Sequence, residues 1–291
     1  MIVKPLIAPQ ELAKLLGQEP VVVIDTRDAA EYASSHIPGA VNIREIFTYL
    51  ANSTPEGLAS LRSQFAELLG TAGVSGMERI VIYEDAMNKG YGQSCRGYFL
   101  LTYLGCSKVS VLHGGYQAWI AAGLATTEEV PIAKEKTFEV KLDSSIMVTT
   151  EEMLQALDEP AIVKLDVRDE DEWLGLSSSP YGVDFCPRKG RIPGAVWIEW
   201  YQMMVPDSKV PMFRSVEEIR DICQQVGITP ETTVYIYCFK GSRAANTLIA
   251  LKEAGIKDVR NYFSSWNEWS RDPKLPIETG EPSKVSVAVT V

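Results

Sequence analysis

The sequence predicts an α/β protein built from two tandem domains, each a mainly parallel sheet flanked by helices. Two observations predict this fold class. One unit of sequence occurs twice, and each copy alternates short apolar runs with longer segments of helical periodicity. The length of 291 residues also fits two domains, because single hydrophobic cores rarely grow past about 250 residues.

The duplication is visible in two pairs of segments. Residues 21–43 and 161–198 both contain an apolar run ending in Asp-x-Arg and, further on, Ile-Pro-Gly-Ala. Residues 73–119 match residues 227–269, and the matched segments follow in the same order in both halves. The second copy carries a long insertion between its two motifs. We therefore expect both halves to share one fold.

Six apolar runs are predicted to be strands, three in each half. They are Val21–Ile24, Ile80–Tyr83 and Val109–Leu112, then Ile162–Leu165, Thr233–Tyr237 and Val259–Tyr262. Helical periodicity marks Leu58–Leu69 and Val216–Val226, among other segments. Apolar strands separated by helices are typical of parallel sheets covered on both faces, and such sheets bind ligands at the carboxyl ends of their strands.

Domain boundaries follow from composition. We expect an N-terminal domain over residues 1–125, a linker over residues 126–145 and a C-terminal domain over residues 146–291. The linker is polar and charged and lacks strong periodicity, as is typical of a segment between domains.

Charge and hydropathy exclude several classes of function. The formal net charge is −10, and no run of Lys or Arg indicates a nucleic-acid face or a membrane anchor. No stretch reaches the roughly 18 to 20 uncharged apolar residues that span a bilayer, and the start lacks the apolar core of a secretion signal. We expect a cytoplasmic protein with no nucleic-acid partner and no membrane partner.

The cysteines are predicted to be free thiols. The five cysteines form no Cys-x-x-Cys pair, and only two histidines are present, so we expect no metal site. Four of them are poor catalytic candidates: Cys95 and Cys223 fall in apparent helices, Cys106 follows a helix end, and Cys186 lies in the insertion.

The fifth cysteine, Cys238, follows directly on a predicted strand. A loop containing Gly241 comes next, and residues 244–251 have helical character. Such a loop turns backbone N–H groups inward at the positive end of a helix dipole, where a thiolate is stabilised. The alternative is that Cys238 is a small buried residue with a structural role only. Its position at the end of a strand argues against this alternative. We predict that Cys238 is the nucleophile and that its loop stabilises the thiolate and binds substrate through Phe239, Lys240, Gly241, Ser242 and Arg243.

Together, Asp-x-Arg, His-Ile-Pro-Gly-Ala, the cysteine loop and the terminal Ser-Trp-Asn-Glu-Trp resemble the tandem-domain rhodanese family of thiosulfate and 3-mercaptopyruvate sulfurtransferases. The resemblance covers nearly the whole chain. It implies that the second repeat is catalytic and the first is silent. Because Tyr83 aligns with Tyr237, Glu84 takes the position of Cys238, and a carboxylate cannot carry sulfur.

The resemblance also implies a double displacement. The Cys238 thiolate takes the outer sulfur of thiosulfate, sulfite leaves, and the resulting persulfide passes its sulfur to cyanide or a thiol. We expect no cofactor, because this sulfur-transfer chemistry needs none. Lys240 favours thiosulfate, and 3-mercaptopyruvate is the alternative donor. Glu172 stands where two-domain members usually carry a substrate-binding arginine, so we expect it to repel the donor. Arg243 is then expected to bind the donor, with Arg188 or Arg191 assisting.

Three further features have both a functional and a structural interpretation. Asp166 either hydrogen-bonds the catalytic loop or forms an ion pair with Arg168, and the ion pair is favoured. Phe239 is expected to face the cleft and to contact an acceptor. The insertion over residues 174–189 either shapes the cleft, which we favour, or covers the surface.

Two rival functions remain. Cysteine phosphatases use a related loop, but they place five residues between Cys and Arg, whereas here only Phe239–Ser242 lie between them, which gives a tighter pocket. A persulfide carrier or docking module without turnover is the second rival, because one scaffold hosts several roles.

Overall fold

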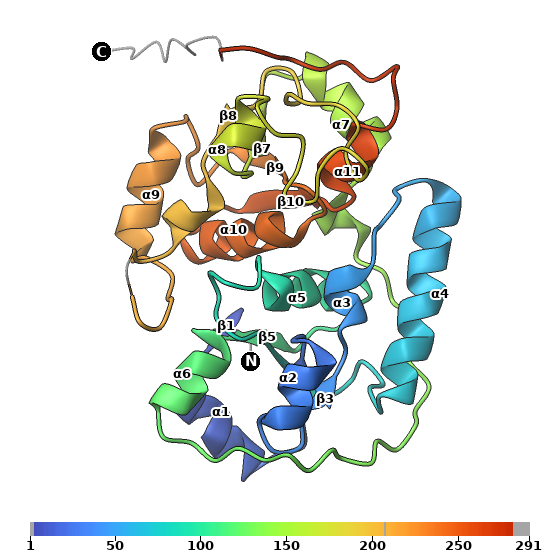
Figure 1. The fold of residues 1–291 in the computed structure, drawn as a ribbon, viewed down its shortest axis with the longest axis vertical. Helices are drawn as coiled ribbons and strands as arrows, with labels where there is room; N and C mark the ends of the chain where they lie inside the picture. Colours follow the sequence, from blue (N-terminus) through green and yellow to red (C-terminus); the bar gives the residue numbers. More distant parts are fainter. Residues whose placement is uncertain (1–2, 207, 282–291) are drawn as a thin grey trace. The chain divides into compact units, whose positions relative to one another are not determined.

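The computed structural model describes residues 3–206 and 208–281. The chain divides into two compact units (Figure 1). The first contains the described residues of 1–49, 55–144 and 205–212, and the second contains those of 50–54, 145–204 and 213–291. Each unit holds a five-stranded sheet with its own helices.

The sheet of the first unit has the order β1-β5-β4-β2-β3, and all its neighbouring strands are parallel. Its strands are β1 (Leu6–Ile7), β2 (Val21–Asp25), β3 (Val41–Asn42), β4 (Arg79–Tyr83) and β5 (Val109–Leu112). Its helices are α1 (Pro9–Leu16), α2 (Ala29–Ser34), α3 (Glu45–Thr48), α4 (Pro55–Thr71), α5 (Gln93–Tyr103) and α6 (Gly115–Ala121).

Alternation along the strands gives the first sheet two buried faces. Val81 and Tyr83 of β4 pack in one cluster with residues of α1, α2 and α6. On the opposite face α5 lies so close to β4 that a Cβ at Gly97 would meet the side chain of Ile82 at 3.0 Å. The central strand is thereby buried on both sides.

The second unit repeats this arrangement with the order β6-β10-β9-β7-β8, again parallel throughout. Its strands are β6 (Met147–Val148), β7 (Ile162–Asp166), β8 (Val196–Trp197), β9 (Thr233–Tyr237) and β10 (Asp258–Tyr262). Its α-helices are α7 (Thr150–Gln155), α8 (Glu170–Trp173), α9 (Val216–Gln224), α10 (Ser242–Glu253) and α11 (Ser265–Trp269). The short 3-10 helices are η1 (Ser144–Ile146), η2 (Ala156–Asp158) and η3 (Trp200–Met203).

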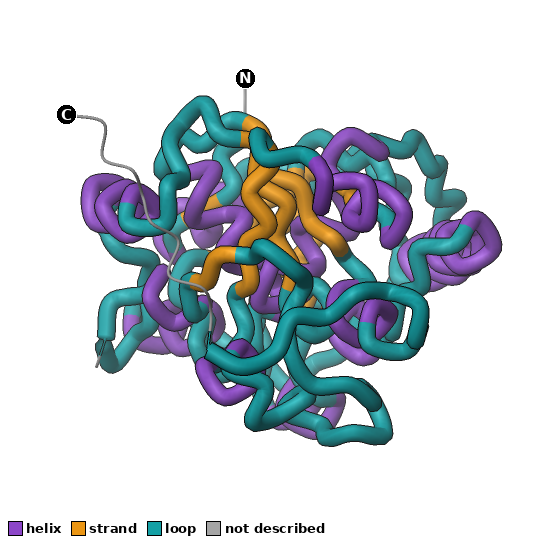
Figure 2. Tube along the Cα trace, turned by 90° about the horizontal axis from the view of Figure 1, so that it is seen from above, coloured by secondary structure: helices purple, strands orange, loops and turns teal. Residues whose placement is uncertain are grey.

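One face of the second sheet is covered by α7, α8 and α11, whose Met153, Trp173 and Trp269 join Tyr235 and Tyr237 in the core. On the other face α10 packs on β9 and β10 and against α9. In Figure 2 helices flank the strands, which are drawn in orange. Central β9 lies between β10 and β7, so its carboxyl end opens at the edge of the sheet where a parallel fold places ligands.

The predicted fold class is confirmed, and so are the six predicted strands, each within one residue at either end. The two-residue edge strands were not predicted. Residues 128–143 form neither helix nor strand and run along the first unit, where the N–H of Lys136 donates to the carbonyl of Gly70. Among the described residues, no helix is both long and apolar enough to cross a membrane.

Candidate active site

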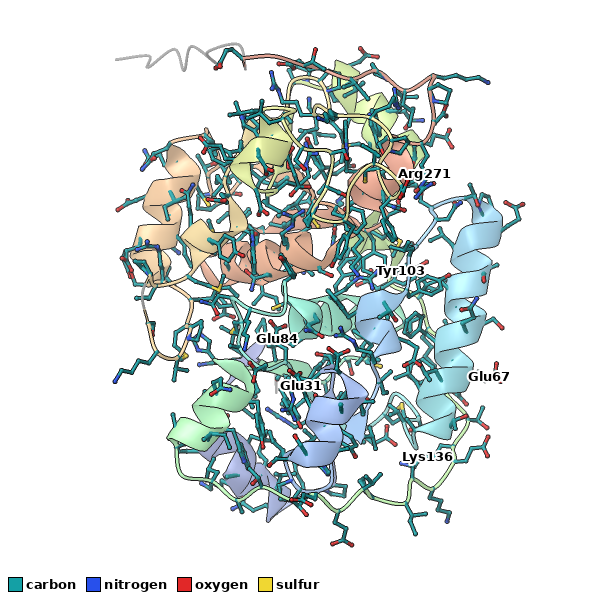
Figure 3. All side chains as sticks on the ribbon, viewed as in Figure 1. Glu31, Glu67, Glu84, Tyr103, Lys136 and Arg271 are labelled. Atoms are coloured by element: carbon teal, nitrogen blue, oxygen red, sulfur yellow. The ribbon has the colours of Figure 1, made fainter. Side chains whose placement is uncertain are left out.

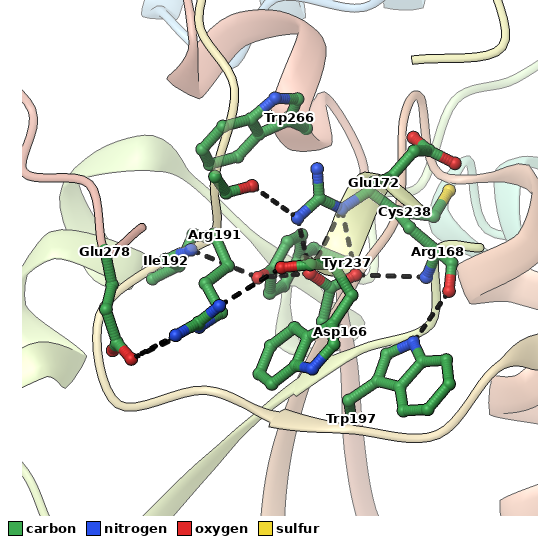
Figure 4. A network of polar contacts seen from close by, with 12 residues as sticks. Asp166, Arg168, Glu172, Arg191, Ile192, Trp197, Tyr237, Cys238, Trp266 and Glu278 are labelled. Carbon is green, nitrogen blue, oxygen red and sulfur yellow. Dashed lines mark hydrogen bonds and ion pairs between the residues drawn. The ribbon is translucent and has the colours of Figure 1, made fainter. Parts of the chain in front are cut away.

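The end of β9 is fixed by its last residue, Tyr237. Its hydroxyl donates to Oδ2 of Asp166 at 2.7 Å and accepts from the N–H of Ile192 at 3.1 Å (Figure 4). The carbonyl of Tyr237 accepts from the N–H of Val167 at 3.1 Å. These contacts hold Cys238, the next residue, at the carboxyl end of the central strand.

The loop after Cys238 turns a backbone amide toward the sulfur. The N–H of Gly241 donates to Sγ of Cys238 at 3.1 Å. Gly241 has φ of 84° and caps the N-terminus of α10, and a Cβ there would lie 2.6 Å from the carbonyl oxygen of Phe263. Only glycine fits this turn without strain. The sulfur therefore sits at the positive end of a twelve-residue helix.

Helix α11 holds the other side of the loop. The N–H of Trp266 donates to the carbonyl of Cys238 at 3.1 Å, and the N–H of Asn267 to the carbonyl of Phe239 at 2.9 Å. The N–H of Cys238 donates to Oγ of Ser265 at 3.2 Å, and Ser265 itself adopts a positive φ of 57°. Sequence reasoning used the Ser-Trp-Asn-Glu-Trp motif of this helix for the family resemblance and did not predict that the helix supports the cysteine loop.

Two further loop residues supply polar groups. Lys240 is largely buried, and its Nζ lies 5.6 Å from the ring centroid of Tyr181. Ser242 begins α10, and its buried hydroxyl has no hydrogen-bond partner among the described residues. The Ser242 hydroxyl is thus a donor that an anion at this helix end could use.

Arg243 and Glu172 form a buried ion pair. Nη1 of Arg243 lies 2.6 Å from Oε2 of Glu172, Nη2 lies 3.1 Å from Oε1, and Asp169 adds a contact of 2.9 Å. Burial alone would lower the pKa of Arg243, but the charge of Glu172 raises it well above its usual value. Sequence reasoning treated the two residues separately, and the structure brings them together.

The same carboxylates make up an acidic cluster. Oxygens of Asp169, Asp171 and Glu172 lie within 4.8 Å of one another. Two of the three pair with Arg243, so the guanidinium compensates their charge.

Asp166 and Arg168 form the favoured ion pair, with Nη2 2.6 Å from Oδ2 and both side chains fully buried. Arg168 also donates to the carbonyl of Gly190 at 2.8 Å and lies over the ring of Trp266 at 4.6 Å. Asp166 reaches the cysteine loop through the hydroxyl of Tyr237. The pair thus joins β7 to the segment after the insertion.

The two other arginines, which were proposed to assist donor binding, contact the end of α11 and the segment that follows it. Arg188 donates to the carbonyls of Trp269, Ser270 and Leu275 at 2.7 to 2.9 Å. Arg191 pairs with Glu278 at 2.6 Å. The structure gives both guanidinium groups partners in the protein.

Phe239 lies in the hydrophobic core and is 4% exposed. Its ring is covered by two aromatic side chains of the insertion, Tyr181 and Phe185, with centroids 5.0 and 6.4 Å away. Phe239 is therefore buried rather than open to solvent, and the exposed rings at this point are those of Tyr181 and Phe185, which sequence reasoning missed. Two aromatic residues in a loop-like insertion were the available signal.

The other cysteines are free and buried. Burial raises the pKa of Cys106 to about 12 and the pKa values of Cys186 and Cys223 to about 11. Such thiols remain protonated near neutral pH and are weak nucleophiles.

The first unit has a carboxylate where the second has Cys238. The N–H of Tyr116 donates to the carbonyl of Glu84 at 2.8 Å, which matches the contact that α11 makes with Cys238. The buried carboxylate of Glu84 (Figure 3) accepts from the N–H and the hydroxyl of Ser94 at 2.6 and 2.8 Å. Burial raises the pKa of Glu84 to about 8.

Comparison with known proteins agrees with this geometry. A rhodanese-like domain matches residues 8–122 and 149–272. The thiosulfate sulfurtransferase of Pseudomonas aeruginosa is 29% identical over 272 residues, covering 94% of this chain and 96% of that protein. The sulfur carrier protein TtuD of Thermus thermophilus is 30% identical over 261 residues. The match covers 87% of this chain and 89% of that protein.

A solved structure of EanB, with a cysteine persulfide in a tetrahedral intermediate state with ergothioneine, superposes with a TM-score of 0.83. It is 25% identical and covers 96% of this chain and 71% of that one. With the domain matched twice and these relatives covered over most of their length, the chain belongs to the rhodanese family as a tandem-domain sulfurtransferase.

Proposed function

We propose that this protein is a thiosulfate sulfurtransferase that carries sulfane sulfur as a persulfide on Cys238. The observation that carries the proposal is the N–H of Gly241 directed at Sγ from the start of α10. That arrangement stabilises negative charge on the sulfur, as a thiolate before the reaction and as a persulfide after it. The first unit has Glu84 at the position of Cys238, and a carboxylate cannot carry sulfur, so we assign the reaction to the second unit.

The first half-reaction needs only a nucleophile and a stabilised anion. The Cys238 thiolate attacks the outer sulfur of thiosulfate, a new S–S bond forms, and the old S–S bond breaks with its electron pair leaving on sulfite. We expect Lys240 to attract the dianion and the hydroxyl of Ser242 to orient it, since that hydroxyl has no hydrogen-bond partner among the described residues. No oxidant is required, and no cofactor takes part.

The choice of donor rests on charge. The relative in Pseudomonas aeruginosa is named a thiosulfate sulfurtransferase, and Lys240 supplies a cation at the loop. Because Glu172 and Asp169 compensate Arg243, that arginine contributes little net charge to the donor site. Lys240 is the other cation of the loop and favours thiosulfate as the donor, with 3-mercaptopyruvate as the alternative.

The acceptor in the second half-reaction is cyanide or a thiol. Free cysteines throughout the described chain fit a reducing compartment, so we place the reaction in the cytoplasm.

Thiocyanate formation from thiosulfate and cyanide tests the proposal, measured beside 3-mercaptopyruvate as donor and beside Cys238→Ser. Turnover with thiosulfate that disappears in the variant supports it, and preference for 3-mercaptopyruvate assigns the sister activity. A persulfide that forms without turnover favours a carrier, as the name of the relative in Thermus thermophilus describes for that protein.

A further inference from the structure

The insertion is anchored to the helix that holds the cysteine loop. The carbonyl of Phe185 accepts from Nδ2 of Asn267 and from Nη2 of Arg271, both at 2.8 Å. The indole N–H of Trp266 donates to the carbonyl of Arg188 at 3.1 Å. Since the amides of Trp266 and Asn267 also bind the loop of Cys238, the insertion and the loop share one support.

This support places two aromatic rings over the residue next to the nucleophile. Tyr181 and Phe185 lie with centroids 5.7 Å apart, and both contact the ring of Phe239. Phe239 is buried, but Tyr181 remains 42% exposed and Phe185 41% exposed. Solvent therefore meets an aromatic surface at this point, with Nζ of Lys240 against the Tyr181 ring.

The chemistry of the two rings differs from that of the Gly241 amide and the Ser242 hydroxyl, which we assign to the Cys238 sulfur and to the donor. Exposed rings bind apolar or aromatic groups through dispersion and offset stacking. Neither thiosulfate nor cyanide has such a group. Two partly exposed rings also offer far less area than the roughly 800 Å² per partner of a stable protein interface. A small organic molecule is the occupant that fits.

We propose that Tyr181 and Phe185 select the sulfur acceptor, a small organic thiol with an aromatic or apolar body. This inference rests on the proposed persulfide at Cys238. The acceptor thiolate attacks the outer sulfur of the persulfide, one S–S bond forms, and the other breaks with its electron pair returning to Sγ of Cys238. The products are the acceptor persulfide and the free enzyme thiolate.

The test separates the two half-reactions. Sulfite release in a single turnover with thiosulfate measures persulfide formation, and transfer is then measured with thiophenol and, separately, with cyanide. Should no sulfite appear, the proposed donor is wrong, and the enzyme is loaded with polysulfide so that acceptor selection is still measured.

The variants are Tyr181→Ser and Phe185→Ser, with Leu176→Ser as the matched control, because Leu176 is an exposed apolar residue of the same insertion. We expect kcat/KM for thiophenol to fall about tenfold in each ring variant, with sulfite release and transfer to cyanide unchanged in Phe185→Ser. Because Tyr181→Ser also removes the ring beside Nζ of Lys240, its rate with thiophenol is compared with its own rate of sulfite release. Tyr181→Phe and Leu176→Ser should keep the rate of the parent protein. An unchanged rate with thiophenol, or an equal fall with both acceptors, would overturn the inference.

Discussion

The carboxylate of Glu172 lies 2.6 Å from the guanidinium of Arg243, and both groups are buried beside the cysteine loop. The pair explains how a carboxylate is tolerated where the resemblance to other two-domain members leads one to expect an arginine. Glu172 pairs with Arg243 at the end of the loop, so the negative charge of Glu172 is compensated by the guanidinium. We therefore expect Glu172 to matter more for stability than for repulsion of the donor.

Glu172→Ala should lower the free energy of unfolding by about 3 to 5 kcal/mol, because it leaves Arg243 buried with only Asp169 opposite. Glu170→Ala, an exposed residue of the same helix, is the control and should change it by no more than about 0.5 kcal/mol. Urea denaturation of both variants makes the comparison. Equal free energies of unfolding in the two variants would show that the Glu172–Arg243 pair contributes nothing to stability.

Gly241→Ala should disable the loop, because its Cβ would lie 2.6 Å from the carbonyl oxygen of Phe263. Gly227 has a similar positive φ of 79°, but the space that a Cβ would enter there is open, so Gly227→Ala bears only the backbone strain of about 1 to 2 kcal/mol. We expect kcat/KM to fall about a hundredfold in the first variant and to stay constant in the second. Steady-state kinetics with thiosulfate and cyanide measure both, and matching rates would exclude a fixed loop geometry as a requirement.

Glu84 should make the first unit less stable as pH rises. Burial raises its pKa in the folded chain to about 8 from an ordinary 4.5. Between these two values the folded state keeps a proton that the unfolded state has lost, so stability is present below pH 4.5 and is lost as pH rises through 8. The loss is on the order of a few kcal/mol.

The Glu84→Gln variant stays neutral and should lack this pH dependence, whereas Glu31→Gln, an exposed carboxylate of α2, should retain it. Denaturation of each variant at pH 5.5 and pH 8.5 makes the measurement. A parent protein whose pH dependence equals that of Glu84→Gln would contradict the assignment.

The sequence predicted what depends on local pattern and repetition. The apolar run Thr233–Tyr237 predicted the central strand, and Cys238 was correctly expected to follow its end. Two-residue strands such as β3 were missed because two residues carry no periodicity. The Glu172–Arg243 pair joins residues 71 positions apart, and the burial of Phe239 depends on an insertion with no regular structure. Neither relationship is encoded in a local pattern.

The central claim is that sulfur resides on Cys238, and the intact mass of the protein after brief exposure to thiosulfate tests it most directly. We predict that the parent protein gains the mass of one sulfur atom, that cyanide removes it, and that peptide mapping places it on Cys238. Cys238→Ser should gain nothing, although the four other cysteines remain. Sulfur found on another cysteine, or retained in the variant, would contradict the account.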